Sequence, residues 1–175
     1  MPAFRPYTLS EVSSGIVPAD RPIRVYADGV YDLLHYGHIN QFKQVKEALP
    51  GCYLIVGVCS DEETEQNKGA RPVMTLEERA ENLRGCPLID ELILAPPFHL
   101  DLNYVNSIQA DIVAHDDIPY PIGTVADVYD DFRKSDRFLA TERTTSISTT
   151  ELVSRIVKQA HAYELKNGVR ELLNA

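Results

Sequence analysis

The chain has 175 residues, of which 44% are hydrophobic, and its formal net charge at pH 7 is -9. This length suits one α/β domain with a core of its own and is short for two. An acidic chain without runs of Lys or Arg is a poor partner for nucleic acid or an anionic membrane, although a few local cations can still bind a nucleotide. The sequence contains no apolar run long enough to cross a bilayer, so we expect no membrane segment.

The cysteines indicate the redox compartment. Cys52, Cys59 and Cys86 lack the spacing of metal ligands, and an odd number of cysteines suits a reducing compartment better than a disulfide framework. The N-terminus does not show the pattern of a secretory signal. We therefore expect a cytoplasmic protein, with the nucleus as the alternative.

Residues 1–22 are predicted to form an extended N-terminal arm outside the core. Prolines at positions 2, 6 and 18 and a Ser-Ser-Gly sequence interrupt the segment, and its few apolar residues follow no regular period. We expect the domain itself to span residues 23–165 and residues 166–175 to form a C-terminal tail.

Within residues 23–165, strand-like and helix-like patterns alternate. Strands are predicted at 23–27, 53–58, 90–94, from 111, and at 138–140, and helices at 39–49, 76–84, 101–109, 125–135 and 152–165, with a polar loop over 60–72. Such alternation favours parallel strands with right-handed crossovers. The fold class is therefore α/β, a single domain built on a Rossmann-like, doubly wound, parallel five-stranded sheet that binds its ligand beyond the carboxyl ends of the strands.

The first strand leads into a His-x-Gly-His sequence formed by residues 35–38, just before a predicted helix. The loop and the helix N-terminus offer unpaired N–H groups to a phosphate, and Gly37 would let the backbone approach that ligand closely. His35 and His38 can each donate a hydrogen bond to phosphoryl oxygens and become more cationic as charge grows on them. The alternative is a pair of partly buried histidines at a helix start.

The His-x-Gly-His sequence resembles the signature of the nucleotidylyltransferase superfamily. The string His-Asp-Asp-Ile-Pro-Tyr at 115–120 is similar to the choline-phosphate cytidylyltransferases within it. Residues 143–149 resemble a second signature, Arg-Thr-x-Gly-Ile-Ser-Thr, except that Ser146 replaces the usual glycine, and Glu142 stands just before it where glutamine is common. The resemblance covers about residues 23–163 and implies transfer of a cytidylyl group from CTP to phosphocholine.

The resemblance also implies which residues form the site. The catalytic residues would be His35, His38, Lys68 and Arg143. The nucleotide-binding residues would be Asp28, Gly29, Val30, Tyr31, His38, Lys68, His115, Asp116, Tyr120, Glu142, Arg143, Thr144, Ile147 and Ser148. The phosphocholine-binding residues would be Lys68, Phe98, Asp116, Tyr120 and Tyr129.

The implied reaction needs neither a protein nucleophile nor a general base, because the phosphate of phosphocholine is already ionised near neutral pH. The protein would position the substrates and stabilise charge on the transferring phosphorus. We expect Mg²⁺ to enter with CTP, bound mainly through its phosphates, and no metal held by the protein alone, because two histidines without a third ligand make a poor zinc site. The resemblance further implies a homodimer.

Two alternatives stay open. One is another transferase of the same superfamily, acting on ethanolamine phosphate, glycerol phosphate or an adenylyl acceptor. The other is a nucleotide-binding regulator with weak or no catalysis, which the departures at Ser146 and Glu142 motivate.

Overall fold

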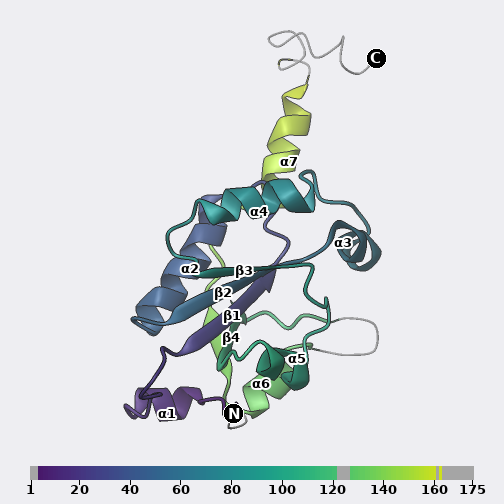
Figure 1. Ribbon diagram of the computed structural model, residues 1–175. Coiled ribbons are helices and arrows are strands. Elements are labelled where there is room, and N and C mark those ends of the chain that lie inside the picture. The colour runs from purple at the N-terminus through teal and green to yellow at the C-terminus, as the bar shows by residue number, and fades with distance from the viewer. Residues whose placement is uncertain (1–3, 122–126, 161, 163–175) are drawn as a thin grey trace.

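The computed structural model describes residues 4–121, 127–160 and 162. Its centre is a parallel sheet of five strands in the order β3-β2-β1-β4-β5 (Figure 1). The strands are β1 (Arg24–Gly29), β2 (Tyr53–Val58), β3 (Glu91–Leu94), β4 (Ile112–Asp116) and β5 (Phe138–Thr141). The chain runs outward from β1 in both directions, so the doubly wound α/β fold is confirmed.

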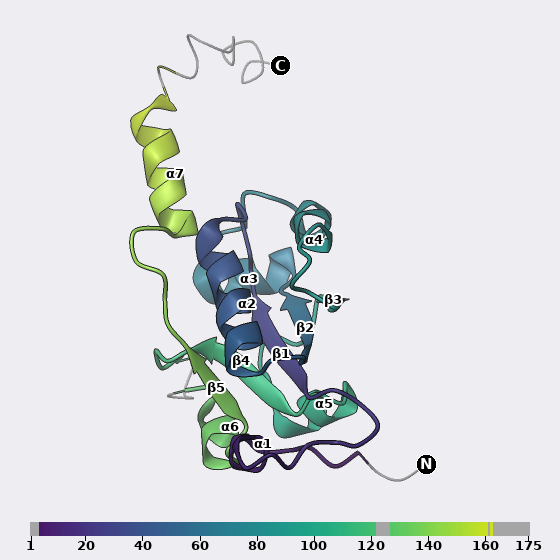
Figure 2. The same ribbon diagram turned by 90° about the vertical axis from the view of Figure 1, so that its left-hand side faces the viewer.

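Helices cover both faces of the sheet. They are α1 (Leu9–Ser13), α2 (Tyr36–Ala48), α3 (Asp61–Lys68), α4 (Leu76–Arg84), α5 (Leu102–Ser107), α6 (Asp130–Lys134) and α7 (Thr149–Lys158). Figures 1 and 2 show α2 and α4 on one face and α5 and α6 on the other. Successive residues of β1 divide between two cores, because Val25 and Ala27 pack on the α2 and α4 side whereas Tyr26 packs on the other.

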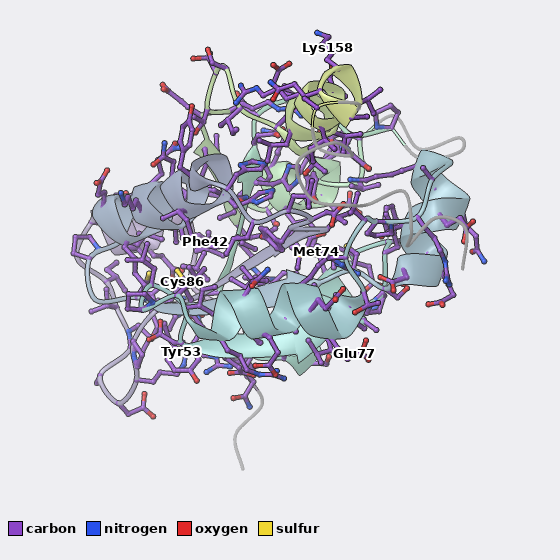
Figure 3. All side chains as sticks on the ribbon, turned by 90° about the horizontal axis from the view of Figure 1, so that it is seen from above. Phe42, Tyr53, Met74, Glu77, Cys86 and Lys158 are labelled. Atoms are coloured by element: carbon purple, nitrogen blue, oxygen red, sulfur yellow. The ribbon has the colours of Figure 1, made fainter. Side chains whose placement is uncertain are left out.

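Side-chain placement follows this layering. Figure 3 shows Phe42 and Cys86 inside the molecule, and Glu77 and Lys158 pointing outward. Helix α7 rises away from the body of the protein, with Ile156 48% and Val157 67% exposed. No helix in the described part of the chain is long and apolar enough to span a membrane.

The polar loop expected over residues 60–72 is instead largely helix α3. The Ser60 hydroxyl caps its start by accepting the Glu63 N–H, and Gly69, at a φ of 79°, ends it in the left-handed region that glycine tolerates. Helix α6 is shorter than the predicted 125–135, starting at Asp130. Residues 125–126 and 163–165 of the predicted helices lie outside the described residues.

The sequence predicted an extended N-terminal arm outside the core, but part of this segment forms a helix and packs on the core. Residues 9–13 form α1, which a Thr8–Glu11 capping box starts. Tyr7 packs against the larger core, and its N–H donates to the carboxylate of Asp111 at 3.0 Å. That buried carboxylate also receives the guanidinium of Arg21. A tertiary ion pair, which local composition does not reveal, therefore ties the segment to the sheet.

Gly57, the last residue but one of β2, leaves space for the hydroxyl of the fully buried Tyr26. A Cβ at this position would lie 2.1 Å from that oxygen. We expect Gly57→Ala to lower the free energy of unfolding by about 1–3 kcal/mol, because the packed ring has no room to retreat. Urea denaturation of Gly57→Ala beside Gly85→Ala, where the nearest atom is 3.6 Å away, checks this. Equal stability of the two variants would contradict it.

Candidate active site

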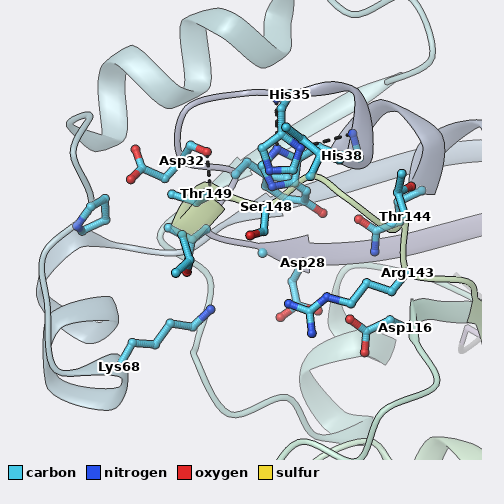
Figure 4. Close-up of a pocket in the computed structure, with 18 of the residues that line it drawn as sticks. Asp28, Asp32, His35, His38, Lys68, Asp116, Arg143, Thr144, Ser148 and Thr149 are labelled. Atoms are coloured by element: carbon cyan, nitrogen blue, oxygen red, sulfur yellow. Dashed lines mark hydrogen bonds between the residues drawn. The ribbon is translucent and has the colours of Figure 1, made fainter. Parts of the chain in front are cut away.

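A cleft of about 420 Å³ opens at the carboxyl ends of β1, β4 and β5, between the N-terminal ends of α2 and α7 (Figure 4). It brings together most of the residues predicted to bind nucleotide, from all four quarters of the chain. Those that line it are Asp28, Gly29, Val30, Tyr31, His35, His38, Lys68, His115, Asp116, Glu142, Arg143, Thr144, Ile147 and Ser148. Tyr120, Tyr129 and Phe98 are not part of this lining.

The two histidines form the cap of helix α2, so the helix begins earlier than predicted. The Gly37 N–H donates to Nδ1 of His35 at 3.2 Å, and the His35 N–H donates to Nδ1 of His38 at 3.4 Å. The imidazole rings stack with centroids 3.8 Å apart. Reciprocal capping therefore fixes both rings at a helix N-terminus, where orphan N–H groups and the helix dipole attract anions.

This geometry sets the protonation of the rings. Because both Nδ1 atoms accept backbone N–H bonds, a neutral ring carries its proton on Nε2. Burial lowers the pKa of His35, and burial together with the charges of His35 and Lys68 lowers the pKa of His38 to about 3. Nε2 of His35 is buried and finds no hydrogen-bond partner among the described residues. At neutral pH the rings are thus neutral donors, and any gain of positive charge must follow the arrival of a phosphate.

Gly37 makes room for neighbouring side chains, in addition to the close approach to a ligand that the sequence predicts. A Cβ at this position would lie 2.9 Å from Nδ1 of His35 and 3.1 Å from Ile147. The glycine therefore lets the His35 ring fold back over the first turn of α2, and lets the second signature pack beside it.

Two cations reach the cleft from opposite sides. Figure 4 shows the side chains of Lys68 and Arg143 entering with Asp28 between them, below the two histidines. Lys68 is the last residue of α3, and its Nζ lies 5.7 Å from the centre of the Tyr120 ring. Arg143 is exposed and also borders a second crevice at the start of α7. The cleft therefore offers positive charge on both flanks of its imidazole donors.

Arg79 supports this arrangement and was not assigned a role from the sequence. Its fully buried guanidinium donates to the carbonyl oxygens of Val30 (2.6 Å) and Cys59 (2.8 Å) and pairs with Asp61. It thus joins the loop after β1 to the start of α3. Because α3 contains no apolar side chain, this polar network, rather than hydrophobic packing, places Lys68 at the cleft.

Asp32 also joins loops around the cleft. Its carboxylate accepts the N–H groups of Val73 (2.8 Å) and Met74 (3.0 Å), and its carbonyl oxygen accepts the Thr149 hydroxyl at 2.9 Å (Figure 4). One buried residue therefore connects the loop after β1 with the loop before α4 and with the start of α7. Its contacts lie 41 and more residues away in sequence, which is why no local pattern indicated them.

The second signature caps helix α7, which begins earlier than the predicted residue 152. The Ser148 hydroxyl accepts the Glu151 N–H at 3.1 Å and starts α7, but the Glu151 carboxylate pairs with Arg155 instead of completing a capping box. Ser146, which replaces the usual glycine, has a φ of 69°. The family's glycine therefore corresponds to a left-handed backbone that serine adopts at a cost.

We expect Ser146→Gly to raise the free energy of unfolding by up to about 1 kcal/mol, because relief of the left-handed strain exceeds the added entropy of the unfolded chain. Thr145→Gly is the matched control: Thr145 has no positive φ, so only the entropy term acts and its stability should fall. Chemical denaturation of both variants tests this. A Ser146→Gly variant less stable than wild type would show that the serine side chain makes a needed contact.

A group of aromatic rings adjoins the cleft on the α6 side of the sheet. The Tyr129 ring stacks on His115 at 4.5 Å, and its hydroxyl donates to Asp28 at 3.2 Å. Tyr120 lies edge-on to His115 at 6.2 Å. Burial raises the pKa of Asp28, and His115, the Tyr129 hydroxyl and Lys68 oppose that rise. We call Tyr120, Tyr129, His115 and Asp28 the aromatic compartment.

The compartment differs from the prediction in two respects. Asp28, predicted for nucleotide, lies between the cleft and these rings, whereas the Asp116 carboxylate accepts the Ile118 N–H and lies 3.6 Å from Nδ1 of His115. Phe98 is buried, and its ring pairs with His99 rather than with the tyrosines. The described residues contain no group of three or more metal-ligating side chains.

A doubly wound parallel sheet with imidazole and cationic donors at its carboxyl ends is typical of α/β proteins that bind nucleotides. The chain belongs to the cytidylyltransferase-like family, whose model matches residues 26–155. This confirms the superfamily suggested by the histidine motif.

Individual proteins agree with this placement. The chain is 44% identical to "Choline-phosphate cytidylyltransferase 2" of Arabidopsis thaliana, over 85% of this chain and 49% of that protein. It is 41% identical to "Ethanolamine-phosphate cytidylyltransferase" of Dictyostelium discoideum, over 78% and 37%. It therefore spans half or less of either relative. The crystal structure of the lipopolysaccharide core biosynthesis protein from Thermoplasma volcanium GSS1 superposes with a TM-score of 0.53 and 26% identity, covering 72% of this chain and 98% of that one.

Proposed function

We propose that the protein transfers a cytidylyl group from CTP to phosphocholine, giving CDP-choline and pyrophosphate. The observation that carries the choice of acceptor is the aromatic compartment, which places ring faces and the half-buried carboxylate of Asp28 directly beside the cleft. The relatives named choline-phosphate cytidylyltransferase support the same acceptor.

In this proposal a phosphate oxygen of phosphocholine attacks the α-phosphorus of CTP in line with the leaving pyrophosphate. The new P–O bond forms as the bond to the β-phosphate oxygen breaks, so no proton has to move. Nε2 of His35 and of His38 would donate to the oxygens on which charge grows, as preorganised donors do in such transfers. Lys68 and Arg143 neutralise the phosphates from either side.

The aromatic compartment would bind the trimethylammonium group. That group has no N–H to donate, so it is recognised by ring faces, worth about 0.5–2 kcal/mol each, and by a nearby carboxylate. Tyr120, which is half-buried, would supply one face. Tyr129, which is 3% exposed, would offer the part of its ring that His115 does not cover. Asp28 supplies the charge, with Asp116 close by on β4, and a bound cation would favour the ionised form of both.

The same proposal includes the surroundings of the reaction. Mg²⁺ would be held chiefly by the phosphates of CTP, because the described residues offer it no cage, and would supply further charge neutralisation. We propose that the protein is a homodimer. We also propose that it acts in the cytoplasm or nucleus, because its three buried cysteines are free, as expected in a reducing compartment.

Two rivals make different predictions. A primary ammonium, as in ethanolamine phosphate, needs hydrogen-bond acceptors rather than ring faces. The aromatic compartment contains three rings and one carboxylate, which suits it less well. A nucleotide-binding regulator without turnover would still bind CTP through the cleft.

Isothermal titration calorimetry separates these functions. With Mg²⁺ present, we expect CTP to bind more tightly than ATP, and phosphocholine more tightly than phosphoethanolamine in the presence of a nonhydrolysable CTP analogue. Tighter binding of phosphoethanolamine would overturn the choice of acceptor. CTP binding without phosphocholine binding would favour the regulator.

A further inference from the structure

A single carboxylate holds the two tyrosines of the aromatic compartment. Asp127 Oδ1 accepts the backbone N–H of Tyr120 at 3.3 Å and that of Tyr129 at 3.1 Å. The carbonyl oxygen of Tyr120 in turn accepts the N–H of Val128 at 3.1 Å. Tyr120 follows β4 and Tyr129 immediately precedes α6, so this is where the two ring-bearing segments meet.

Arg133 holds the carboxylate in place from helix α6. Its Nε donates to Asp127 at 3.1 Å and its Nη1 to Asp117 at 2.5 Å. The guanidinium lies 3.8 Å from the centre of the Phe138 ring, and that ring packs against Tyr129 at 5.6 Å. Only 14% of the Asp127 side chain is exposed. The carboxylate therefore bonds on one oxygen to two backbone N–H groups and on the other to a stacked arginine.

The protonation of Asp127 agrees with this role. Partial burial would raise its pKa, but the N–H groups of Tyr129 and Tyr120 and the charge of Arg133 together lower the pKa below its ordinary value. The group is therefore ionised at neutral pH, which strengthens each of its hydrogen bonds.

Ring placement decides how well a cage accepts a cation, because cation–π attraction requires the charge over the ring face within about 6 Å. Asp28 bonds to the Tyr129 hydroxyl and the His115 ring packs against both tyrosine rings, but neither bonds to the backbone segments that carry them. Asp127 bonds to the backbone of both. We propose that Asp127, secured by Arg133, is a positioning residue that sets the spacing of the two rings and thereby the preference for a quaternary over a primary ammonium. This rests on the proposed function and extends it to specificity.

Asp127→Ala and Asp127→Asn test the proposal, with Asp130→Asn as the matched control. Asp130 lies three residues further on, and its carboxylate pairs with Lys134 on the surface, with no hydrogen bond to either tyrosine backbone among the described residues. We expect Asp127→Ala to raise the KM for phosphocholine about three- to thirtyfold, as expected for one or two weakened cation–π contacts, with the KM for CTP and kcat little changed. The ratio of kcat/KM for phosphocholine over phosphoethanolamine should fall, and Asp127→Asn, which keeps one acceptor oxygen, should be intermediate.

A binding readout keeps the proposal independent of turnover. Tetramethylammonium is titrated against the tyrosine ring signals in NMR spectra of wild type, Asp127→Asn and Asp130→Asn. Weaker binding in Asp127→Asn alone supports the proposal, even if Asp127→Ala does not fold. Equal tetramethylammonium affinity in all three proteins, or an unchanged acceptor preference in Asp127→Asn, would overturn it. Wild-type protein that binds tetramethylammonium but does not use phosphocholine would overturn the proposed function and not this inference.

Discussion

Replacing His35 by alanine is expected to lower kcat about 10²- to 10³-fold while changing KM much less, because a donor that strengthens only as charge develops contributes chiefly to the transition state. The structure gives the reason: Nε2 of His35 is buried without a partner among the described residues and faces the cleft from a helix N-terminus. His38→Ala should behave similarly, since its ring is capped in the same way. Steady-state kinetics with both substrates varied measures the effect.

The exposed His99, outside the cleft, supplies the control, and His99→Ala should keep wild-type kinetics. Thermal melts of all three variants separate loss of chemistry from loss of the α2 cap. A folded His35→Ala variant as active as wild type would end the assignment of this histidine to catalysis.

Lys68→Ala should have the second large effect, lowering kcat/KM for both substrates by about 10- to 100-fold, the scale of one lost charged hydrogen bond. Lys68 stands between the cleft and the aromatic compartment, so it can reach the phosphates of both substrates. Arg143→Ala should act in the same direction from the opposite flank. Lys68→Arg should recover little, because the planar guanidinium cannot replace a compact ammonium at the end of α3.

Lys158→Ala provides the comparison, since Lys158 points outward from α7 (Figure 3). Kinetics at several salt concentrations distinguish the loss of a direct contact from a change in the electrostatic potential of the whole protein. Salt would screen only the second effect strongly. If Lys68→Ala keeps wild-type kcat/KM for both substrates, α3 has no part in catalysis.

The sequence was sufficient to predict the layers of the fold, because they depend on local periodicity. The continuous apolar run at 53–58 predicted β2 at its observed bounds, and the helix predicted at 76–84 is observed as α4. The histidine motif and the second signature were both expected at the carboxyl ends of strands, and the structure brings them to one cleft.

The remaining features depend on contacts between distant residues. Helix α3 has no apolar side chain, so no hydrophobic period could predict it from the sequence. An ion pair between Asp61 and Arg79 holds it in place. The bond between Asp28 and Tyr129 joins residues 101 positions apart. No local pattern could have indicated that Asp28 belongs beside the rings.

Direct detection of the product tests the central claim. The protein is incubated with CTP, Mg²⁺ and equal concentrations of phosphocholine, phosphoethanolamine and glycerol phosphate, and the nucleotide products are identified by mass spectrometry, with ATP in a parallel reaction. We predict CDP-choline as the main product, one pyrophosphate released for each molecule formed, and little product from ATP. CDP-ethanolamine or CDP-glycerol as the main product, or bound CTP that is never consumed, would contradict the account.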